Sequence, residues 1–186
     1  MLNLDKYDWA AGTATEHLNV IRSAPQHVMR DLARSYDWRH YPETSLGWLM
    51  AQKCIDLPTA ISAFFNGGPE RFNYLHKRDV PHEFHPTARI LDNICLRVNS
   101  GFYLASRETK LDKRRLRKWL AAQHVDRNEG QCGRWVLDES ILDNLFASLE
   151  PSYSQNPLHD ALRDERKLPS RLIRAIQNRR RNATLH

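Results

Sequence analysis

The sequence predicts an all-α fold, a single compact domain of about nine or ten short helices over residues 1–177. Most of the nine prolines stand where a helix would begin, which is the position at which a missing N–H costs least. Apolar residues recur in several segments every three or four positions, the spacing of one helix face. The chain of 186 residues is 41% hydrophobic and 27% charged, a composition that excludes disordered and fibrous proteins.

The first three helices are expected before residue 54. Thr13 or Thr15 can cap the first of them, because either hydroxyl can accept a hydrogen bond from a free N–H of the first turn. Pro25 opens the second helix. The third is expected over residues 44–53, where apolar residues return at helical spacing after an aromatic-rich linker.

The middle of the chain contains clear start and stop signals. Asp56 can cap a helix that ends at residues 66–68, Asn-Gly-Gly, because glycine readily adopts the left-handed conformation that follows a helix. Pro69 opens the next helix. A loop over residues 78–86 then leads into a longer helix, in which residues 90–98 repeat apolar positions at helical spacing.

The second half of the chain adds charged and apolar helices. A strongly charged helix is expected from residue 111 to about residue 126, and Asp138 can cap a helix with the clearest apolar stripe in the sequence. Two further helices open at Pro157 and Pro169. Residues 178–186 are expected to form a frayed basic tail.

The cysteines and the lack of a long apolar stretch indicate in which cellular compartment the protein is found. The chain has 28 Lys and Arg residues against 22 Asp and Glu residues, a net charge of +6, and three cysteines without a Cys-x-x-Cys pair. Cysteines in this arrangement favour reduced thiols. No stretch approaches the roughly 18 apolar residues of a membrane span, and charged residues interrupt the region where a signal peptide would be apolar. We therefore expect a cytoplasmic protein without membrane contact.

Two motifs follow each other in the first half of the chain: residues 36–38 read Tyr-Asp-Trp, and residues 54–60 read Cys-Ile-Asp-Leu-Pro-Thr-Ala. Over about residues 28–70 the chain resembles a small bacterial family of helical domains without an assigned function. It departs from the family pattern at residues 39–42, where a Gly-rich turn is expected. The resemblance implies an immunity-like or accessory binding protein of bacterial contact competition, and it carries over no catalytic residues.

Two basic clusters are the strongest physical signal in the sequence. The first lies on the charged helix over residues 110–118, whose cations share one face opposite Leu116 and Trp119, and the second lies over residues 163–181. Such a surface favours an acidic protein partner, and the phosphates of a nucleic acid are the alternative. The residues expected to form this basic face are Lys110, Lys113, Arg114, Arg117, Lys118, Arg171 and Arg174.

Two aromatic and polar segments stand out beside the basic clusters. Arg71 and Tyr74 belong to one, and Phe102 and Tyr103 belong to the other. Arginine and tyrosine are common anchors of protein interfaces, so all four residues are interface candidates. The plainer interpretation is that they bind loops onto a helical core through hydrogen bonds and ring contacts.

A histidine-rich loop over residues 76–85 is the first place to look for a metal site. His82 and His85 could supply two ligands, with Asp92 or Cys95 on the following helix as further candidates. The spacing matches no specific zinc motif. The plainer interpretation is a solvated loop in which His85 caps the following helix, and we expect no cofactor.

No catalytic motif is present in the sequence. The nucleophile elbow Gly-x-Ser-x-Gly, the phosphate-binding Gly-rich loops and His-Glu-x-x-His are all absent. Cys54 and Cys95 lie beside apolar residues, which indicates inert buried thiols, and only Cys132 stands in an electropositive stretch. An enzymatic function is therefore unsupported by the sequence.

The function that these observations predict is non-enzymatic protein binding, of the immunity-like or accessory kind, through a basic and aromatic-bearing surface. Nucleic-acid binding by the basic helices over residues 110–118 and 163–181 is one alternative. A metal-dependent enzyme at the loop over residues 76–85 is the other. The sequence leaves the oligomeric state open.

Overall fold

The structure is a computed structural model of the chain, and it describes residues 7–106 and 111–143. All regular elements among these residues are helices, and no β-strand occurs in this part of the chain. The predicted all-α fold is therefore confirmed for the residues that the structure describes.

Two compact units divide the chain, residues 1–149 and residues 150–186. The second unit lies outside the described residues, and so do the helices expected at Pro157 and Pro169 and the expected C-terminal tail. The single domain over residues 1–177 stays a prediction. All elements named below belong to the first unit.

α1 (Ala14–Ser23) and α2 (Gln26–Ser35) confirm the first two predicted helices. α1 starts with a capping box: the Thr13 hydroxyl accepts from the Glu16 N–H at 3.3 Å, and the Glu16 carboxylate accepts from the Thr13 N–H at 2.7 Å. Behind this turn His17 is fully buried among aromatic rings, and burial lowers the pKa of its imidazole. The aromatic cluster thus holds a neutral histidine at the start of the fold.

The third predicted helix, over residues 44–53, is shorter than expected and begins as a π-helix instead of an α-helix. Pro42–Leu46 forms a π-helix and Gly47–Leu49 forms the single turn α3. Leu46 and Leu49, the last residues of the two segments, are fully buried, so the π-helix still directs apolar side chains into the core. After Leu49 the segment ends in tighter turns, with the Gln52 N–H donating to the Leu49 carbonyl at 2.9 Å, and the Met50 carbonyl accepts from the Tyr103 hydroxyl at 2.9 Å.

α4 (Leu57–Asn66) is the most apolar helix among the described residues. The Asp56 carboxylate accepts from the Thr59 N–H at 2.9 Å, which confirms the predicted cap. Every residue of α4 except Ser62 and Asn66 is buried, so nearly the whole circumference of the helix lies in the core. The chain leaves it through Gly68, whose φ of 66° is left-handed as expected.

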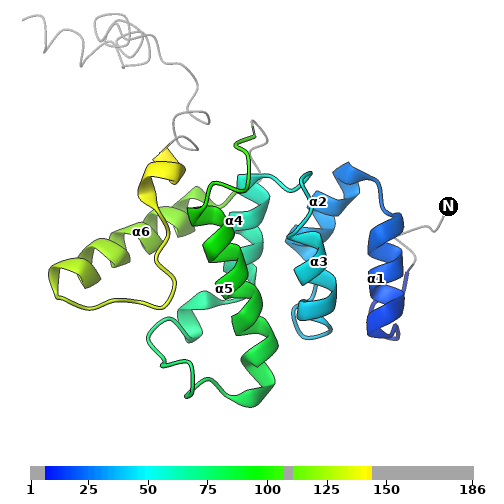
Figure 1. The fold of residues 1–186 in the computed structure, drawn as a ribbon, viewed down its shortest axis with the longest axis horizontal. Coiled ribbons are helices and arrows are strands. Elements are labelled where there is room, and N and C mark those ends of the chain that lie inside the picture. Colours follow the sequence, from blue (N-terminus) through cyan, green and yellow to red (C-terminus); the bar gives the residue numbers. More distant parts are fainter. Residues whose placement is uncertain (1–6, 107–110, 144–186) are drawn as a thin grey trace, which may run out of the picture. The chain divides into compact units, whose positions relative to one another are not determined.

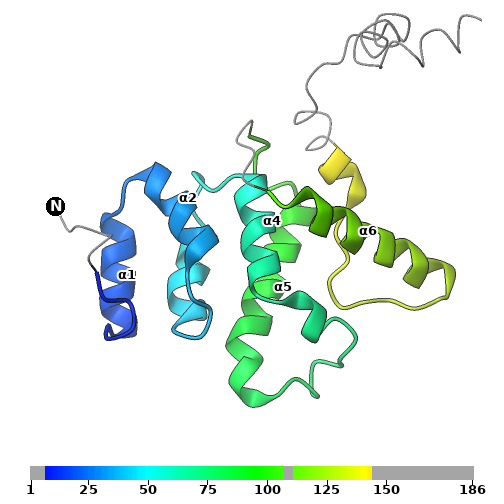
Figure 2. The same cartoon turned by 180° about the vertical axis from the view of Figure 1, so that it is seen from behind.

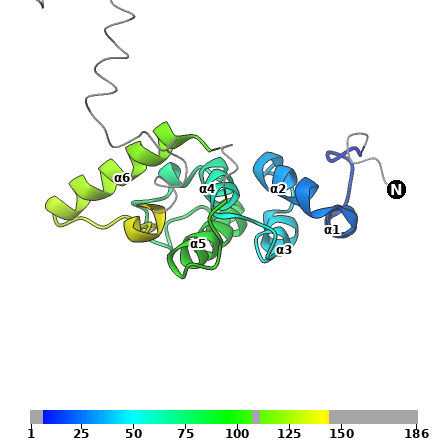
Figure 3. The same ribbon diagram turned by 90° about the horizontal axis from the view of Figure 1, so that it is seen from above.

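α5 (His85–Asn99) packs against α4 and completes the centre of the first unit. Its predicted apolar positions Ile90, Leu91 and Ile94 are all buried. Figures 1 and 3 show α4 and α5 side by side, with α2 and α3 against one side of this pair. The core therefore lies where four helices meet.

Some predicted elements are shorter than expected or missing. Pro69 opens only the 3-10 turn Pro69–Arg71, where the sequence predicted a helix. The described residues hold seven helices, α1 to α6 and one that begins at Glu139, so the expected number of nine or ten is not supported. The turn at Pro69 ends at Phe72, which is buried in the core.

α6 (Lys113–Asn128) is the charged helix predicted over residues 111–126. The Asp112 carboxylate accepts from the Arg115 N–H at 3.0 Å and caps it. Figure 2 shows α6 on the side of the α4 and α5 pair that faces away from α1. None of the helices in the described ranges combines the length and the apolar character that a membrane crossing requires.

Candidate functional site

A pocket of about 240 Å³ lies between α6 and the segment that follows the 3-10 turn. α6 stands over this segment because the Trp119 ring packs edge-on against Phe64 and Phe65 of α4, with centroids 5.6 and 5.9 Å away. The lining combines an apolar floor with polar groups from both sides. It consists of Glu70, Asn73, Tyr74, Arg115, Lys118, Trp119, Ala122, Gln123 and Asp126.

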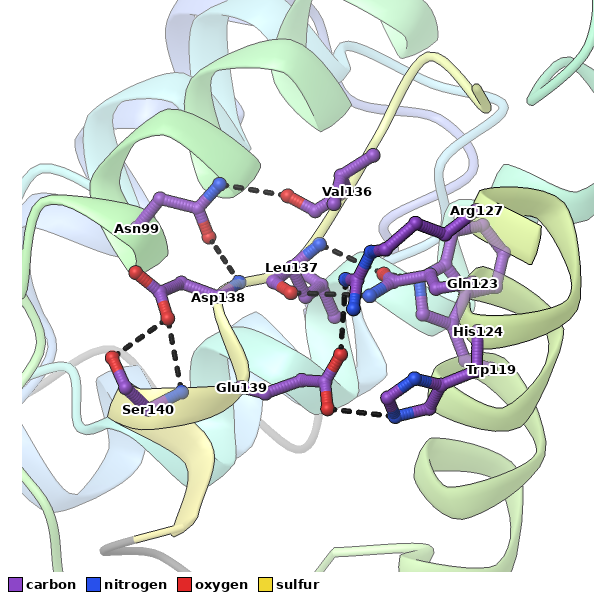
Figure 4. Close-up of polar contacts among 10 residues, drawn as sticks. All are labelled: Asn99, Trp119, Gln123, His124, Arg127, Val136, Leu137, Asp138, Glu139 and Ser140. Carbon is purple, nitrogen blue, oxygen red and sulfur yellow. Dashed lines mark hydrogen bonds and ion pairs between the residues drawn. The ribbon is translucent and has the colours of Figure 1, made fainter. Parts of the chain in front are cut away.

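The floor of the pocket is fixed by the buried amide of Gln123. Its Oε1 accepts from the Trp119 indole N–H at 2.8 Å and from the Leu137 N–H at 2.8 Å, and its Nε2 donates to the Leu137 carbonyl at 3.1 Å (Figure 4). These bonds satisfy a polar group that is only 6% exposed. The indole of Trp119 is therefore held in one orientation.

Two polar pairs lie on the rim of the pocket, one of them an ion pair. The Arg115 guanidinium donates to both oxygens of Glu70 at 3.0 Å each, and it lies 5.0 Å over the ring of Phe65. Opposite it, the Tyr74 hydroxyl donates to the Asp126 carboxylate at 2.9 Å. This hydrogen bond raises the pKa of Tyr74, although 59% of the residue is exposed.

The segment behind the pocket is held by two polar side chains. Asn73 accepts the Trp135 N–H on its Oδ1 at 3.0 Å, and its own carbonyl accepts the Arg134 N–H at 2.7 Å. Gly133 lies so close to the Asn73 amide that a Cβ there would collide with it. Asp92 of α5 accepts from the Arg134 guanidinium at 3.0 and 2.7 Å and from the Trp135 indole at 2.8 Å.

A second set of polar contacts joins the ends of α5 and α6 to residues 136–139, where the last described helix begins (Figure 4). Asn99 donates to the Val136 carbonyl at 2.7 Å and accepts the Asp138 N–H at 2.9 Å. Glu139 lies 2.8 Å from His124 and 3.3 Å from Arg127. These contacts close the loop after α6 and keep the C-terminal half of the helix in place.

The predicted basic face is partly present around the pocket. Arg114, Arg117 and Lys118 are exposed, and Lys118 lines the pocket, whereas Lys113 is half-buried. The other predicted members, Lys110, Arg171 and Arg174, lie outside the described residues.

The four aromatic and arginine candidates have different surroundings. Tyr74 lies on the rim of the pocket, and Arg71 is exposed with its guanidinium 5.2 Å over the ring of Phe72. Phe102 is 42% exposed. Tyr103 is only 3% exposed, and burial raises the pKa of its hydroxyl to about 12. Tyr103 is therefore a core residue and not part of an exposed surface, as the plainer interpretation of the sequence has it.

The histidine loop does not gather metal ligands. The rings of His82 and His85 lie 5.2 Å apart, and His85 Nε2 is 2.9 Å from the Val80 carbonyl, while His85 itself is the first residue of α5 and not its cap. Asp92 is engaged by Arg134. Among the residues that the structure describes, no three His, Cys, Asp or Glu side chains are grouped so as to hold an ion.

The three cysteines differ in burial. Cys95 is buried, and this raises the pKa of its thiol to about 11, which agrees with the inert role expected. Cys54 is half-buried, with its Sγ 3.7 Å from the sulfur of Met29, so it is less enclosed than predicted. Cys132 is exposed in the loop after α6.

Comparison with known proteins adds no relative. No protein-family model, curated protein or solved structure matches the chain. The resemblance over residues 28–70 therefore stays a prediction. The residues that carry it have structural roles here, since Asp56 caps α4 and the ring of Trp38 lies against Gly67.

Proposed function

We propose that this chain is a non-enzymatic, cytoplasmic binding protein, of the immunity-like or accessory kind, that docks an acidic segment of a partner protein on α6. The observation that supports it best is the pocket between α6 and residues 70–74. The pocket puts the exposed cation Lys118 beside the aromatic residues Tyr74 and Trp119. Basic and aromatic side chains around an apolar hollow are typical of protein-binding surfaces.

The charges of α6 favour an acidic partner. Five of the first six residues of α6, over 113–118, are Lys or Arg, and the positive end of the helix dipole lies there too. Like charges three or four positions apart also repel. Glu70 offsets one of them through Arg115, while Arg114 is exposed. Carboxylates of a partner over this face would relieve the repulsion, so docking would stabilise α6 itself.

The pocket itself suits a single apolar side chain of that partner. Its volume of about 240 Å³ is small, and its floor is the ring of Trp119 with Ala122. Glu70 and Asp126 on the rim would repel any anionic group that entered here, phosphate and carboxylate alike, so the pocket itself suits an uncharged side chain. A partner segment with an apolar side chain in the pocket and acidic residues over Arg114 and Arg117 would fit both the pocket and the basic face of α6.

Site-specific photo-crosslinking tests this proposal. A photo-reactive phenylalanine analogue at Ala122 lies in the pocket, and the same analogue at the exposed Ala51 serves as the matched control. We expect position 122 alone to capture one discrete protein of acidic character, and the double variant R114E/R117E to abolish the capture. Equal capture at both positions, or none at position 122, would contradict the proposal.

Nucleic-acid binding is the second candidate, because of the five cations over residues 113–118. Fluorescence anisotropy of labelled duplex DNA and single-stranded RNA tests it at low and near-physiological salt. Saturable binding that persists at the higher salt and is lost when Lys113, Arg114 and Arg117 are changed to Glu would identify a nucleic acid, and not an acidic protein, as the partner. Binding that vanishes with salt would leave the basic face to an acidic protein.

A further inference from the structure

We propose that a second pocket, beside the start of α5, binds a phosphoryl group. This pocket has a volume of about 220 Å³ and lies in the histidine loop that the sequence offered as a metal site. Its lining contains three permanent cations and an imidazole, and it contains no carboxylate. The lining residues are Lys77, Val80, His85, Ala88, Arg89 and Arg134.

Arg134 is a cation held in a fixed position. Its Nε and Nη2 donate to Asp92, its guanidinium lies 5.0 Å over the ring of Trp135, and its side chain is only 13% exposed. Its third nitrogen, Nη1, is enclosed and has no hydrogen-bond partner. A planar guanidinium that is held in this way loses little rotamer freedom when it binds an anion, because its orientation is already set.

Arg89 and Lys77 can adapt to an anion. Arg89 pairs with Glu43 at 2.9 Å, but both side chains are well exposed, at 63% and 41%. Exposed pairs of this kind are weak, so an anion in the pocket can compete with Glu43 for the guanidinium. Lys77 is exposed on the loop that forms the other wall. One fixed and two adjustable cations thus surround the same space.

The surrounding backbone adds to the positive potential. His85 Nε2 lies 2.9 Å from the Val80 carbonyl, an acceptor, so this nitrogen carries a hydrogen and the ring orientation is set. α5 begins at this residue, and its helix dipole presents a partial positive charge on this side. Glu43 and Asp92 offset part of this potential, because each is paired with one of the two arginines, but neither carboxylate lines the pocket.

The size and charge of the pocket favour a phosphoryl group over other anions. Sites that enclose a whole drug-sized ligand measure about 300–1,000 Å³, so this pocket can enclose only a small group or the end of a larger ligand. A phosphate monoester carries about −1.5 to −2 charges at neutral pH, which matches several cations better than a carboxylate does. The phosphoryl group can belong to a free small ester or to a phosphorylated peptide. This inference uses none of the residues of the α6 pocket and does not depend on the function proposed above.

Isothermal titration calorimetry at constant ionic strength tests the site, with inorganic phosphate, O-phosphoserine and acetate as probes. We expect saturable binding of phosphate with a stoichiometry of one, and at least tenfold weaker binding of acetate. The double variant K77Q/R89Q should lower the phosphate affinity at least tenfold. R78Q removes an exposed cation from the same loop without touching the lining, and it should leave the affinity unchanged.

Two results would overturn the inference. One is the absence of saturable phosphate binding to the unaltered chain, and the other is an equal loss of affinity in R78Q and in K77Q/R89Q, which would indicate unspecific attraction. A phosphoserine peptide with an acidic flank distinguishes the two sources. Tighter binding of this peptide than of inorganic phosphate, with the same dependence on Lys77 and Arg89, would identify a phosphorylated protein as the ligand, and weaker binding would identify a small phosphate ester.

Discussion

α4 and α6 are both helices of the first unit, but different forces hold them. α4 carries no charged residue and is buried on nearly every side. α6 buries only Leu116, Trp119 and Gln123, and besides the packing of Trp119 on the α4 rings it is held by hydrogen bonds and ion pairs to Glu70, Leu137 and Glu139. Burial of apolar surface is strong and non-directional, whereas a few polar contacts are directional and individually weak.

This difference indicates which part of the molecule can change its conformation when a partner binds. Elements with few buried apolar contacts open at a lower free energy than the core, and binding surfaces are drawn from such elements. α6 has this character and also carries the pocket and the exposed cations. The comparison predicts that damage to α4 unfolds the whole unit, while damage to α6 releases that helix alone.

Phe64→Ala in α4 should give the largest effect. Phe64 is fully buried and contacts Phe65, Trp119 and Trp135 through its ring. Removing a buried phenylalanine typically costs about 3–5 kcal/mol, and we expect this loss in the free energy of unfolding, measured by urea denaturation with circular dichroism. Phe102→Ala, at a position that is 42% exposed, is the control. If Phe64→Ala lost no more stability than this control, α4 would not be the stable centre of the unit.

Gln123→Ala in α6 should cost less and act locally. It leaves the Trp119 indole and the backbone groups of Leu137 without their buried partner, at a cost of about 1–3 kcal/mol. Amide hydrogen exchange should show lower protection in α6 and unchanged protection in α4. Gln131→Ala, in the exposed loop after α6, should change neither helix. Equal loss of protection in both helices would mean that α6 is part of the cooperative core.

The caps of the two helices offer a matched pair. Asp56 caps α4 with a side chain that is 8% exposed and lies 3.6 Å from Arg30, whereas Asp112 caps α6 at an exposed position. Loss of an N-cap costs about 0.5–2 kcal/mol, and we expect D56A at the upper end of this range and D112A at the lower end. Thermal denaturation of the two variants measures the difference. A larger loss of stability in D112A than in D56A would contradict this expectation.

Titration of Tyr74 at alkaline pH should have the smallest effect and should act on the α6 side, whereas titration of the buried Cys95 and Tyr103, with pKa values of about 11 and about 12, would act on the core. The hydrogen bond to Asp126 raises the pKa of Tyr74 above its ordinary value of 10.0. The contact therefore stabilises the fold fully below pH 10 and loses this contribution as the pH rises through the raised pKa. Hydrogen exchange of α6 against pH measures it, and Tyr74→Phe should remove this dependence. The same slope in that variant would assign the effect to another group.

The helix starts could be predicted because caps depend on residues a few positions apart. Thr13 and Glu16 form the capping box of α1, and Asp56 precedes α4 with a proline in the first turn. The early end of the segment over residues 44–53 could not be predicted, and at this end the Met50 carbonyl accepts from Tyr103, which lies 53 positions away. Such a contact between distant segments leaves no periodic signal in the sequence.

The candidate site was harder to predict than the fold. Its basic and aromatic members Lys118 and Tyr74 stood out by type, but nothing indicated that they line one pocket. The pocket depends on Arg115 reaching Glu70, which lies 45 positions away in the chain. Gln123 is a polar residue on a charged helix and would be placed in solvent, yet it is buried because it satisfies the backbone of Leu137.

The close approach of Gly133 to Asn73 also has an evolutionary consequence. Any side chain at position 133 would push the following segment away from Asn73 and Asp92, and so would disturb the hydrogen bonds of Arg134 and Trp135 to both residues at once. Selection should therefore preserve these positions together while the charged surface diverges. Descendants of the same ancestor should be recognisable by a discontinuous signature, an asparagine, an aspartate and then Gly-Arg-Trp at residues 133–135, even where little else in the sequence is shared.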